Sequence, residues 1–295
     1  MMKSSIILIG NPAARRASVQ KLERAAAFLR EKGFHVEVLM TQKRGDAEIQ
    51  AKESAGKKPF LIIAAGGDGT INEVINGMVW SGVPLSILPL GTTNVLAKEL
   101  GIPEEVQPAM ERALKGRPKT VSLGRITLGG DNASADRYFC LMAGIGFDGK
   151  AVRDTNPSLK KISGEAAYIL SGMKNLLWYS PSELKIKANG DEYTGYAAVI
   201  GKAAKYGGHF KITPDACLPD PYLYACIFQG RKRTDLLRYV LGVIRGTHLT
   251  ERDIVYIRTT DMEVRGEAHI QIDGDYLGVT PARLSVAKDA LKIVY

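Results

Sequence analysis

Residues 60–73 read FLIIAAGGDGTINE, and they decide the fold because a buried strand runs directly into a glycine-rich loop. The first six residues are continuously apolar, which is typical of a strand that is covered on both faces. Helical spacing of apolar residues predicts a helix over 71–81. Gly66, Gly67 and Gly69 would let backbone N–H groups approach a phosphate, and the start of the helix adds a partial positive charge. The stretch therefore predicts a phosphate-binding loop.

Asp68 lies inside this loop, where its carboxylate would repel a phosphate directly. A cation that bridges the carboxylate and the phosphates would remove the repulsion, and Mg²⁺ is the ion that commonly does so. Taken alone, the loop also fits a tight turn in which Asp68 caps the helix and Thr70 is solvated. The rest of the N-terminal region favours the first interpretation.

Two further predicted strands of this region end in loops of small residues. Residues 6–9 (IILI) precede Gly10-Asn11-Pro12, and residues 85–88 precede PLGTTN at 89–94. Alternating strands and helices of this size predict a parallel sheet with helices on both faces, whose ligands bind at the carboxyl ends of the strands. The three loops would then meet in one crevice.

From about residue 121 the expected strands outnumber the helices. We therefore expect an α/β nucleotide-binding domain of residues 1–125, which residues 287–295 would complete if the apolar segment 291–295 returns to it. A β-rich, sandwich-like domain of residues 126–286 would bind the second substrate, with the nucleotide site in the cleft between the domains. The other expected elements are strands at 34–40, 121–128, 137–143, 183–188, 196–200, 222–228, 254–259, 262–265 and 269–272, and helices at 18–32, 46–53, 94–100, 165–178 and 234–246.

Composition and charge exclude several classes of protein. The 295 residues are 45% apolar and 24% charged, as in ordinary folded proteins. No apolar run approaches the ~20 residues of a membrane span or resembles a signal peptide, so we expect a cytoplasmic protein. Three cysteines without paired spacing favour free thiols. The net charge of +9 indicates an anionic partner, and no nucleic-acid recognition pattern accompanies it.

Taken together, in order and spacing, the loops carry a resemblance. GGDGTINEVINGM at 66–78, PLGTTNVLAKELGIP at 89–103, GIGFDG at 144–149 and DGD at 273–275 resemble the diacylglycerol kinase catalytic-domain family of bacterial, sphingosine-kinase-like and YegS-like lipid kinases. GGDGT alone is shared with NAD kinases and phosphofructokinases, whereas the combination is specific. The resemblance spans nearly the whole chain. It implies an NAD-kinase-like and diacylglycerol-kinase-like α/β domain followed by a β-rich sandwich.

This resemblance implies transfer of the γ-phosphoryl group of Mg-ATP to the hydroxyl of diacylglycerol or a related lipid alcohol. Asp275 would be the general base and Asp68 would serve the magnesium ion, although DGD is also a common hairpin turn. An accessory magnesium site would use the carbonyls of Cys217 and Tyr222 and the Asp220 carboxylate. The nucleotide-binding residues that we predict are Asn11, Pro12, Ala13, Ala14, Arg15, Thr41, Gly66, Gly67, Asp68, Gly69, Thr70, Asn72, Glu73, Gly91, Thr92 and Asn94.

The sequence departs from the family pattern at the metal sites. Val95 stands where an acid often follows the asparagine of PLGTTN, and Ser122 replaces an acid that is common at the domain junction. Asp220 precedes a proline where glycine is usual, and Asp275 stands where glutamate is usual. Two alternatives to a lipid kinase therefore stay open: an NAD kinase or other soluble-metabolite kinase, and a catalytically weak nucleotide- or lipid-binding relative.

The GIGFDG loop at 144–149 also matches the glycine pattern of dinucleotide-binding folds. Asn156-Pro157 would interrupt the long helix that such a fold needs, so we expect a loop that lines the cleft. Asp148 in this loop is then either a functional residue or a turn former, and the sequence favours neither.

Residues 160–179 combine an apolar helical face with lysines and end in Trp178-Tyr179. This pattern is typical of a helix that rests on an anionic membrane, and equally of a core helix with one solvated side. We expect a lipid alcohol as substrate, peripheral contact with an anionic membrane surface and no nucleic-acid partner. The sequence leaves the oligomeric state open, a homodimer included.

Overall fold

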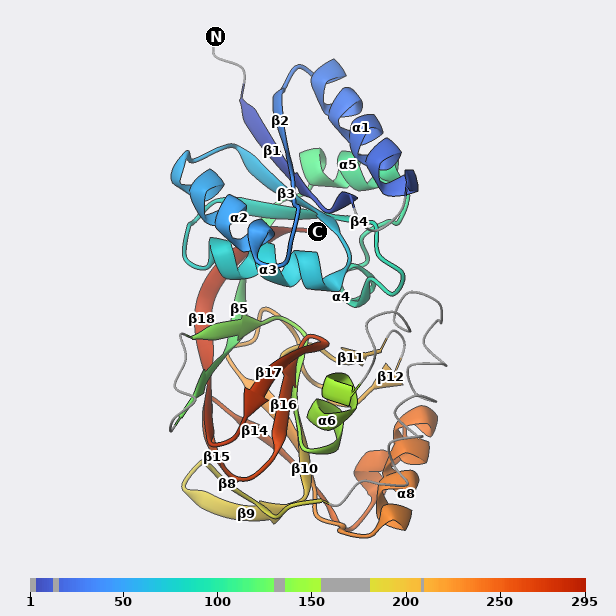
Figure 1. The fold of residues 1–295 in the computed structure, drawn as a ribbon, viewed down its shortest axis with the longest axis vertical. Coiled ribbons are helices and arrows are strands. Elements are labelled where there is room, and N and C mark those ends of the chain that lie inside the picture. Colours follow the sequence, from blue (N-terminus) through green and yellow to red (C-terminus); the bar gives the residue numbers. More distant parts are fainter. Residues whose placement is uncertain (1–3, 13–15, 130–135, 155–180, 208–209) are drawn as a thin grey trace. The chain divides into compact units, whose positions relative to one another are not determined.

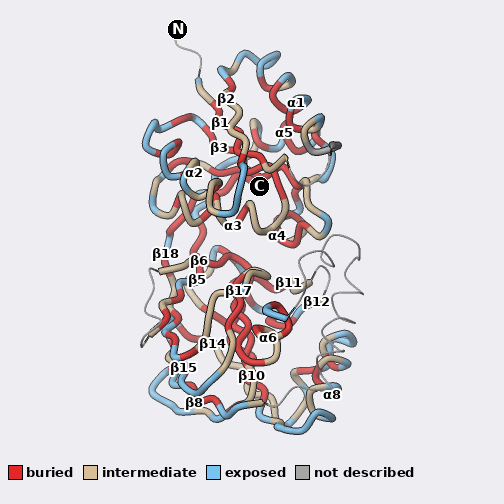
Figure 2. The backbone as a smooth tube through the Cα atoms, in the orientation of Figure 1, coloured by how far each residue is buried: buried red, intermediate tan, exposed pale blue. Residues whose placement is uncertain are grey.

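The computed structural model describes residues 4–12, 16–129, 136–154, 181–207 and 210–295. The chain divides into two compact units: unit 1 comprises Met1–Ser122 and Lys288–Tyr295, and unit 2 comprises Leu123–Ala287. In each unit the buried residues follow the strands, so each has a core of its own (Figure 2).

Unit 1 alternates strands and helices: β1 (Ser5–Gly10), α1 (Arg16–Glu31), β2 (His35–Met40), α2 (Asp46–Gly56), β3 (Leu61–Gly66), α3 (Asp68–Met78), β4 (Pro84–Pro89), α4 (Val95–Glu99), α5 (Val106–Lys115), and the last part of β18 (Ala282–Val294). The strands form a parallel sheet in the order β2-β1-β3-β4-β18. Helices α1 and α5 cover one face, and α2 and α3 cover the other (Figure 1). Every residue of β3 is buried, as expected for a strand covered on both faces.

Helices α2 and α3 pack so closely that Gly77 of α3 has no room for a side chain. A Cβ atom built on Gly77 would lie 2.3 Å from the carbonyl oxygen of Glu48 and 2.9 Å from the Cβ atom of Ala51. Ala47, Ala51 and Ala55 bury small side chains along the same side of α2. The absence of a side chain at Gly77 therefore fixes the position of α3, which begins at Asp68.

The described part of unit 2 is a β-sandwich with helices at its surface. Its elements are β5 (Pro118–Leu128), β6 (Arg137–Phe139), β7 (Met142–Ile145), α6 (Phe147–Asp154), β8 (Leu184–Ala188), β9 (Asp191–Gly195), β10 (Ala197–Gly201), β11 (Lys205–Tyr206), β12 (Phe210–Lys211), β13 (Leu223–Phe228), α8 (Arg233–Arg245), the 3₁₀ helix η4 (His248–Thr250), β14 (Ile254–Thr259), β15 (Asp261–Gly266), β16 (His269–Ile272) and β17 (Asp275–Val279), with the first part of β18.

The two layers of unit 2 enclose one apolar core. One antiparallel layer has the strand order β14-β13-β10-β7-β16-β17, and the other contains β18-β15-β8-β9 with β5 and β6. Ile200 and Ile227 from the first layer belong to the same buried cluster as Ile186, Val264 and Leu284 from the second.

The elements expected within the described residues are found with two informative differences, whereas α5, α6, β9, β11, β12, β17 and most of β18 were not expected. The helix expected over 71–81 begins earlier, at Asp68, because the chain leaves its extended conformation immediately after Gly67. The strand expected over 137–143 is two strands, β6 and β7, separated at Cys140 and Leu141. The GIGFDG segment at 144–149, expected as a loop, is the end of β7 and the first turn of α6. The helix expected over 165–178 lies outside the described residues.

Residues near 291–295, whose destination the sequence left open, return to unit 1. Lys292 and Ile293 of β18 pair in parallel with Pro84 and Leu85 of β4. Among the residues that the structure describes, no helix has the length and apolar character that crossing a bilayer requires.

The contact between α2 and α3 generates a stability prediction. We expect Gly77→Ala to lower the free energy of unfolding by about 1–3 kcal/mol, because the added methyl group would overlap the backbone of α2. Gly56→Ala, at the exposed end of α2 where no atom lies within 4 Å of the new Cβ, is the matched control. It should be neutral or stabilise by up to about 1 kcal/mol. Urea denaturation followed by circular dichroism measures both, and equal stability of the two variants would contradict the prediction.

Candidate functional site

The loops that follow β1, β2, β3 and β4 lie along one edge of the unit 1 sheet. Parallel pairing brings the carboxyl ends of these strands to that edge. Backbone hydrogen bonds join each strand exit to a neighbour: Asn11 N–H donates to the Ala65 carbonyl (3.3 Å), Thr41 N–H to that of Gly10 (2.9 Å), and Leu90 N–H to that of Gly66 (2.9 Å). The three predicted loops, together with Thr41, therefore form one continuous edge.

The loops after β3 and β4 touch through their backbones. A Cβ atom on Gly91 would lie 2.5 Å from the Cα atom of Gly67, and one on Gly67 would lie 3.3 Å from the Cα atom of Gly91. The packing therefore requires glycine at position 91 and leaves little room for a side chain at position 67. The two loops form a cradle of main chain, which a single side-chain carbon at Gly91 would fill.

Asn94 shapes the second of these loops. Its Oδ1 accepts a hydrogen bond from the Gly91 N–H (2.9 Å), and its Nδ2 donates to the Gly91 carbonyl (3.0 Å). The residue is 3% exposed and has a left-handed backbone, which asparagine adopts more readily than most residues. Asn94 therefore supports the loop from beneath, whereas Thr92 is exposed at its tip.

Asp68 begins α3 and reaches across to α4. Its Oδ1 accepts a hydrogen bond from the Leu96 N–H at 3.3 Å. Burial raises the pKa of the Asp68 carboxyl, and the N–H groups of Val95 and Leu96 and the charge of Lys98 act in the opposite direction. The carboxylate thus has a structural contact besides the cation-binding role that the sequence suggests.

Glu73 holds the loop after β2 against α3. Its Oε1 accepts a hydrogen bond from the Gly45 N–H at 3.0 Å. Gly45 has a φ of 90° and precedes Asp46, which accepts hydrogen bonds from the N–H groups of Gln42 (2.8 Å) and Lys43 (2.9 Å). Those two bonds lower the pKa of the Asp46 carboxyl. Glu73, predicted to bind nucleotide, therefore supports the loop that contains Thr41.

The remaining predicted nucleotide residues divide into packed and accessible ones. Asn72 is 5% exposed, and its Oδ1 accepts a hydrogen bond from Asn76 Nδ2 at 3.1 Å. Gly66 has no room for a side chain, because a Cβ atom there would lie 2.6 Å from that of Thr70. Asn11, Pro12, Gly69 and Thr70 are half-buried, and Ala13, Ala14 and Arg15 lie outside the described residues.

Asp273 is a structural residue of unit 2. Its Oδ1 accepts the N–H groups of Leu141 and Met142, and its Oδ2 accepts that of Cys140, all at 2.9 Å. Burial raises the pKa of this carboxyl, and the three N–H groups act against the shift. Because these N–H groups point at the carboxylate, they cannot continue the ladder of a strand. This contact explains the break between β6 and β7.

Asp275 follows a two-residue hairpin turn. Asp273 and Gly274 form the turn with φ values of 47° and 86°, and Ile272 pairs with Asp275 across it. The hairpin interpretation of DGD is therefore correct for the backbone. Asp273 clamps the turn to β7, and Asp275 starts β17 as a half-buried residue.

A chain of side chains connects this turn to the GIGFDG loop. Gly274 N–H donates to Gln271 Oε1 (2.7 Å), and Gln271 Nε2 donates to Asp148 Oδ2 (2.6 Å). The Tyr206 hydroxyl donates to the other oxygen of Asp148. Burial raises the pKa of Asp148, and the hydrogen bonds from Tyr206 and Gln271 oppose the shift. Asp148 lies in the first turn of α6 and is therefore not a turn former. Its carboxylate orients Gln271, which in turn binds the turn before Asp275.

The residues of the accessory metal site do not fit a metal ion. The Cys217 carbonyl accepts hydrogen bonds from Lys202 Nζ (2.7 Å) and from the Asp220 N–H (3.2 Å). Tyr222 has the guanidinium of Arg258 over its ring, 4.5 Å from the centroid. In the part of the chain that the structure describes, no three His, Cys, Asp or Glu side chains gather as a metal site.

The two positions where acids are usual in the family have packing roles. Val95 is 7% exposed in the first turn of α4. Ser122 is fully buried, and its hydroxyl oxygen accepts a hydrogen bond from the Asp289 N–H at 3.2 Å. Neither residue supplies a charge, so neither adds a carboxylate beside Asp68.

Sequence reasoning missed Lys202, Gln271 and Tyr206. Gln271 carried a usable signal, since it is a polar residue inside the apolar strand HIQI and is 1% exposed. Lys202 follows an apolar strand, where a lysine is ordinarily solvated, and nothing nearby in the sequence indicates its burial.

Comparison with known protein families matches both halves of the chain. The diacylglycerol kinase catalytic domain matches residues 5–126, and the YegS C-terminal NAD kinase beta sandwich-like domain matches residues 142–295. Diacylglycerol kinase from Bacillus subtilis (strain 168) is 31% identical over 282 residues, covering 93% of this chain and 90% of the relative. Diacylglycerol kinase from Staphylococcus aureus (strain JH9) is 27% identical over 288 residues, covering 96% and 89%.

Solved structures share the fold. A diacylglycerol kinase from Bacillus anthracis str. Sterne matches with a TM-score of 0.75 and 21% identity, covering 100% of this chain and 98% of that one. Yeast NADH kinase in complex with NADH matches with a TM-score of 0.58 and 9% identity, covering 100% and 84%. At these identities the likeness is one of fold alone. By its two matched domains and its 31% identical relative, this chain belongs to the diacylglycerol kinase family and is a phosphotransferase with an alcohol group as acceptor.

Proposed function

We propose that this protein transfers the γ-phosphoryl group of Mg-ATP to the hydroxyl of a lipid alcohol, with diacylglycerol as the first candidate. The observation that carries the proposal is the backbone contact between Gly67 and Gly91, at the exits of β3 and β4. Backbone N–H groups in such glycine loops bind phosphates, and the first turn of α3 adds its partial positive charge. The relatives named diacylglycerol kinase favour diacylglycerol as acceptor.

Asp68 would hold the magnesium ion together with the phosphates. Burial already raises the pKa of this carboxyl, so a nearby cation would stabilise its ionised form. Magnesium usually keeps several waters and binds through one or two carboxylates and the phosphates. When bound, the ion would neutralise charge that develops on the transferred group. Asp68 as the single carboxylate ligand is consistent with this way of binding magnesium.

Asp275 would accept the proton of the lipid hydroxyl. The hydroxyl oxygen forms a bond to the γ-phosphorus, the bond from that phosphorus to the bridging oxygen breaks, ADP leaves, and the proton passes to the Asp275 carboxylate. Asp273 and Gln271 hold the turn that precedes this residue. We therefore assign Asp275 to chemistry and Asp273 to positioning.

Helix α8 is the surface that we propose for membrane contact. Leu237, Leu241 and Ile244 are 37%, 40% and 45% exposed, and their spacing places them on one face. Exposed basic residues border the helix, with Arg231–Arg233 at its start and Arg245 at its end. Apolar residues beside basic ones are the pattern of a helix that lies on anionic lipid. The segment 160–179, considered from the sequence for this role, lies outside the described residues.

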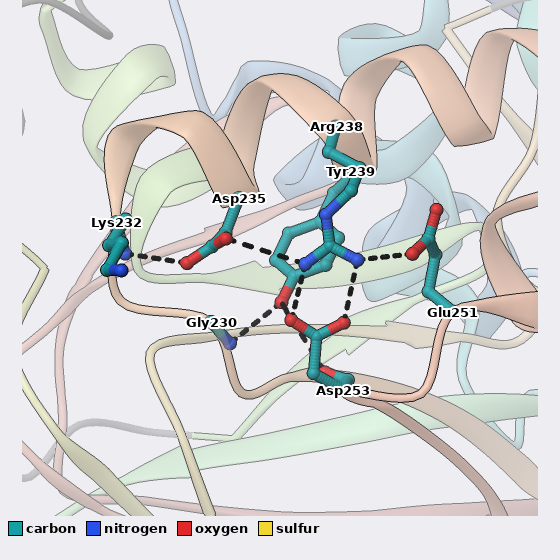
Figure 3. Close-up of polar contacts among 7 residues, drawn as sticks. All are labelled: Gly230, Lys232, Asp235, Arg238, Tyr239, Glu251 and Asp253. Atoms are coloured by element: carbon teal, nitrogen blue, oxygen red, sulfur yellow. Dashed lines mark hydrogen bonds and ion pairs between the residues drawn. The ribbon is translucent and has the colours of Figure 1, made fainter.

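An ion-pair cluster holds α8 with this face outward (Figure 3). Arg238 Nη2 donates to Asp253 Oδ2 (2.5 Å), and Arg238 Nη1 donates to Glu251. The Tyr239 hydroxyl donates to Asp253 Oδ2 (2.6 Å) and accepts the Gly230 N–H (2.7 Å). These contacts tie the inner side of α8 to the segment before β14.

The proposed activity is tested by transfer from γ-labelled ATP to diacylglycerol, a sphingoid base, phosphatidylglycerol and NAD, with magnesium and with EDTA. Magnesium-dependent labelling of a lipid alcohol is the expected result. Labelling of NAD alone would make the protein a soluble-metabolite kinase, and absence of labelling in every arm would favour the catalytically weak relative.

We expect Asp68→Asn to reduce lipid phosphorylation by about 10²-fold or more, the loss typical of removing one electrostatic stabiliser. The amide keeps an oxygen for the Leu96 N–H, so the melting temperature should change little. Glu73→Gln is the matched control, because it keeps the acceptor for Gly45 and should retain activity within a few-fold. Wild-type turnover by Asp68→Asn would contradict the proposal that Asp68 holds the magnesium ion.

We expect Asp275→Asn to lower kcat by ~10²–10⁴-fold with little change in ATP affinity, because it removes a general base. Asp275→Glu should keep measurable activity. Asp273→Asn should instead destabilise the protein by about 1–3 kcal/mol, because one of three backbone N–H contacts loses its acceptor. Steady-state kinetics and thermal melting separate the two roles. An inactive but fully stable Asp273→Asn, beside an active Asp275→Asn, would reverse the assignment.

We expect Leu241→Gln to weaken binding to vesicles that contain anionic lipid by about 10-fold. The reason is that a leucine side chain contributes about 1.5–3 kcal/mol when it moves from water into an apolar environment such as lipid. Thr234→Gln, at an exposed position in the first turn of the same helix, is the control. Vesicle sedimentation at low and high salt measures both, and binding should fall as salt rises. Equal affinity of the two variants would exclude this face of α8.

A further inference from the structure

Lys202 is a charged side chain that is completely buried in unit 2. It follows β10 directly, and its relative exposure is 0%. Lysine is almost never fully buried unless its ammonium group is paired. Here Nζ donates to the carbonyl oxygens of Cys217 (2.7 Å) and Leu218 (3.0 Å). The ammonium thus binds the loop between β12 and β13 at two consecutive residues.

The Cys217 carbonyl has no lone pair left for a metal ion. A carbonyl oxygen has two lone pairs, and this one already accepts Lys202 Nζ and the Asp220 N–H. Resemblance to the kinase family makes the same oxygen a ligand of an accessory magnesium ion. The ammonium and the metal would therefore compete for one acceptor.

The charges around this loop also favour the lysine. The Lys202 ammonium already supplies one positive charge at the carbonyl oxygens of Cys217 and Leu218. Arg258 brings a second positive group, its guanidinium 4.5 Å from the Tyr222 ring centroid. A divalent cation next to the ammonium and the guanidinium would meet two like charges, with Asp220 as the only carboxylate among its expected ligands.

We propose that the ammonium group of Lys202 is a built-in cation that takes the place of the accessory magnesium ion, so that the loop from Thr213 to Tyr222 closes without a metal. Asp220 then balances the charge of a lysine and is not a metal ligand. This inference concerns the stability of unit 2 and does not depend on the proposed reaction. A chain with the lysine needs no divalent cation to order this loop.

The first experiment measures the melting temperature of the full chain without nucleotide, in EDTA and in magnesium chloride, for wild type and Asp220→Asn. We expect the magnesium-induced shift, which includes any effect of magnesium at Asp68, to be the same in both proteins. A shift that is present in wild type and lost in Asp220→Asn would overturn the proposal, because Asp220 would then be a metal ligand.

A second pair of variants tests directly whether the Lys202 ammonium and a magnesium ion can replace each other. Lys202→Ala removes the ammonium and leaves room beside the two carbonyl oxygens, so its melting temperature should fall in EDTA and rise when magnesium is added. Lys202→Met removes the charge but fills the space, so its melting temperature should fall without a response to magnesium beyond that of wild type. A larger magnesium response in Lys202→Met than in Lys202→Ala would contradict the exchange. Lipid phosphorylation is measured separately, so failure of either proposal leaves the other intact.

Discussion

The contact between the backbones of Gly67 and Gly91 is the constraint on which the candidate nucleotide site depends. It requires that β3 and β4 end side by side, which the parallel sheet achieves, and that α3 begins without delay after β3. Asn94 holds the loop after β4 in place, and Glu73 holds the loop after β2. Several residues of the glycine motifs thus hold the loops in position through their own hydrogen bonds, and the surface that they maintain is bare main chain.

Unit 2 has a comparable centre at Leu141, where two regions of the chain converge. Its N–H donates to the Asp273 carboxylate, and its carbonyl accepts the N–H groups of Lys202 (2.8 Å) and Ala203 (3.1 Å). The turn before Asp275 and the segment that carries the buried lysine are therefore anchored to the same residue. The two segments are therefore connected through the backbone of one residue.

The sequence predicted those parts of the structure whose causes are local. Apolar runs followed by glycines identify β3 and β4 with their loops, and alternating patterns identify most strands of unit 2. The break at Cys140 could not be predicted, because the carboxylate that causes it belongs to Asp273, more than a hundred residues later in the chain. Lys202 was missed for the same reason, since its partners Cys217 and Leu218 approach only after the chain folds back. The loop-supporting hydrogen bonds of Asn94 and Glu73 likewise could not be predicted, because they depend on how the loops pack in the folded chain.

Strand β18 runs through both units, and this has a consequence for synthesis on the ribosome. Its residues 282–285 pair with β15 in the sandwich, whereas Lys292 and Ile293 complete the parallel sheet beside β4. Until those last residues emerge, a nascent unit 1 exposes the edge of β4, and open strand edges are sites of unwanted pairing. Unit 1 therefore emerges from the ribosome before the segment that completes its sheet, and the edge of β4 stays open while the sandwich is translated.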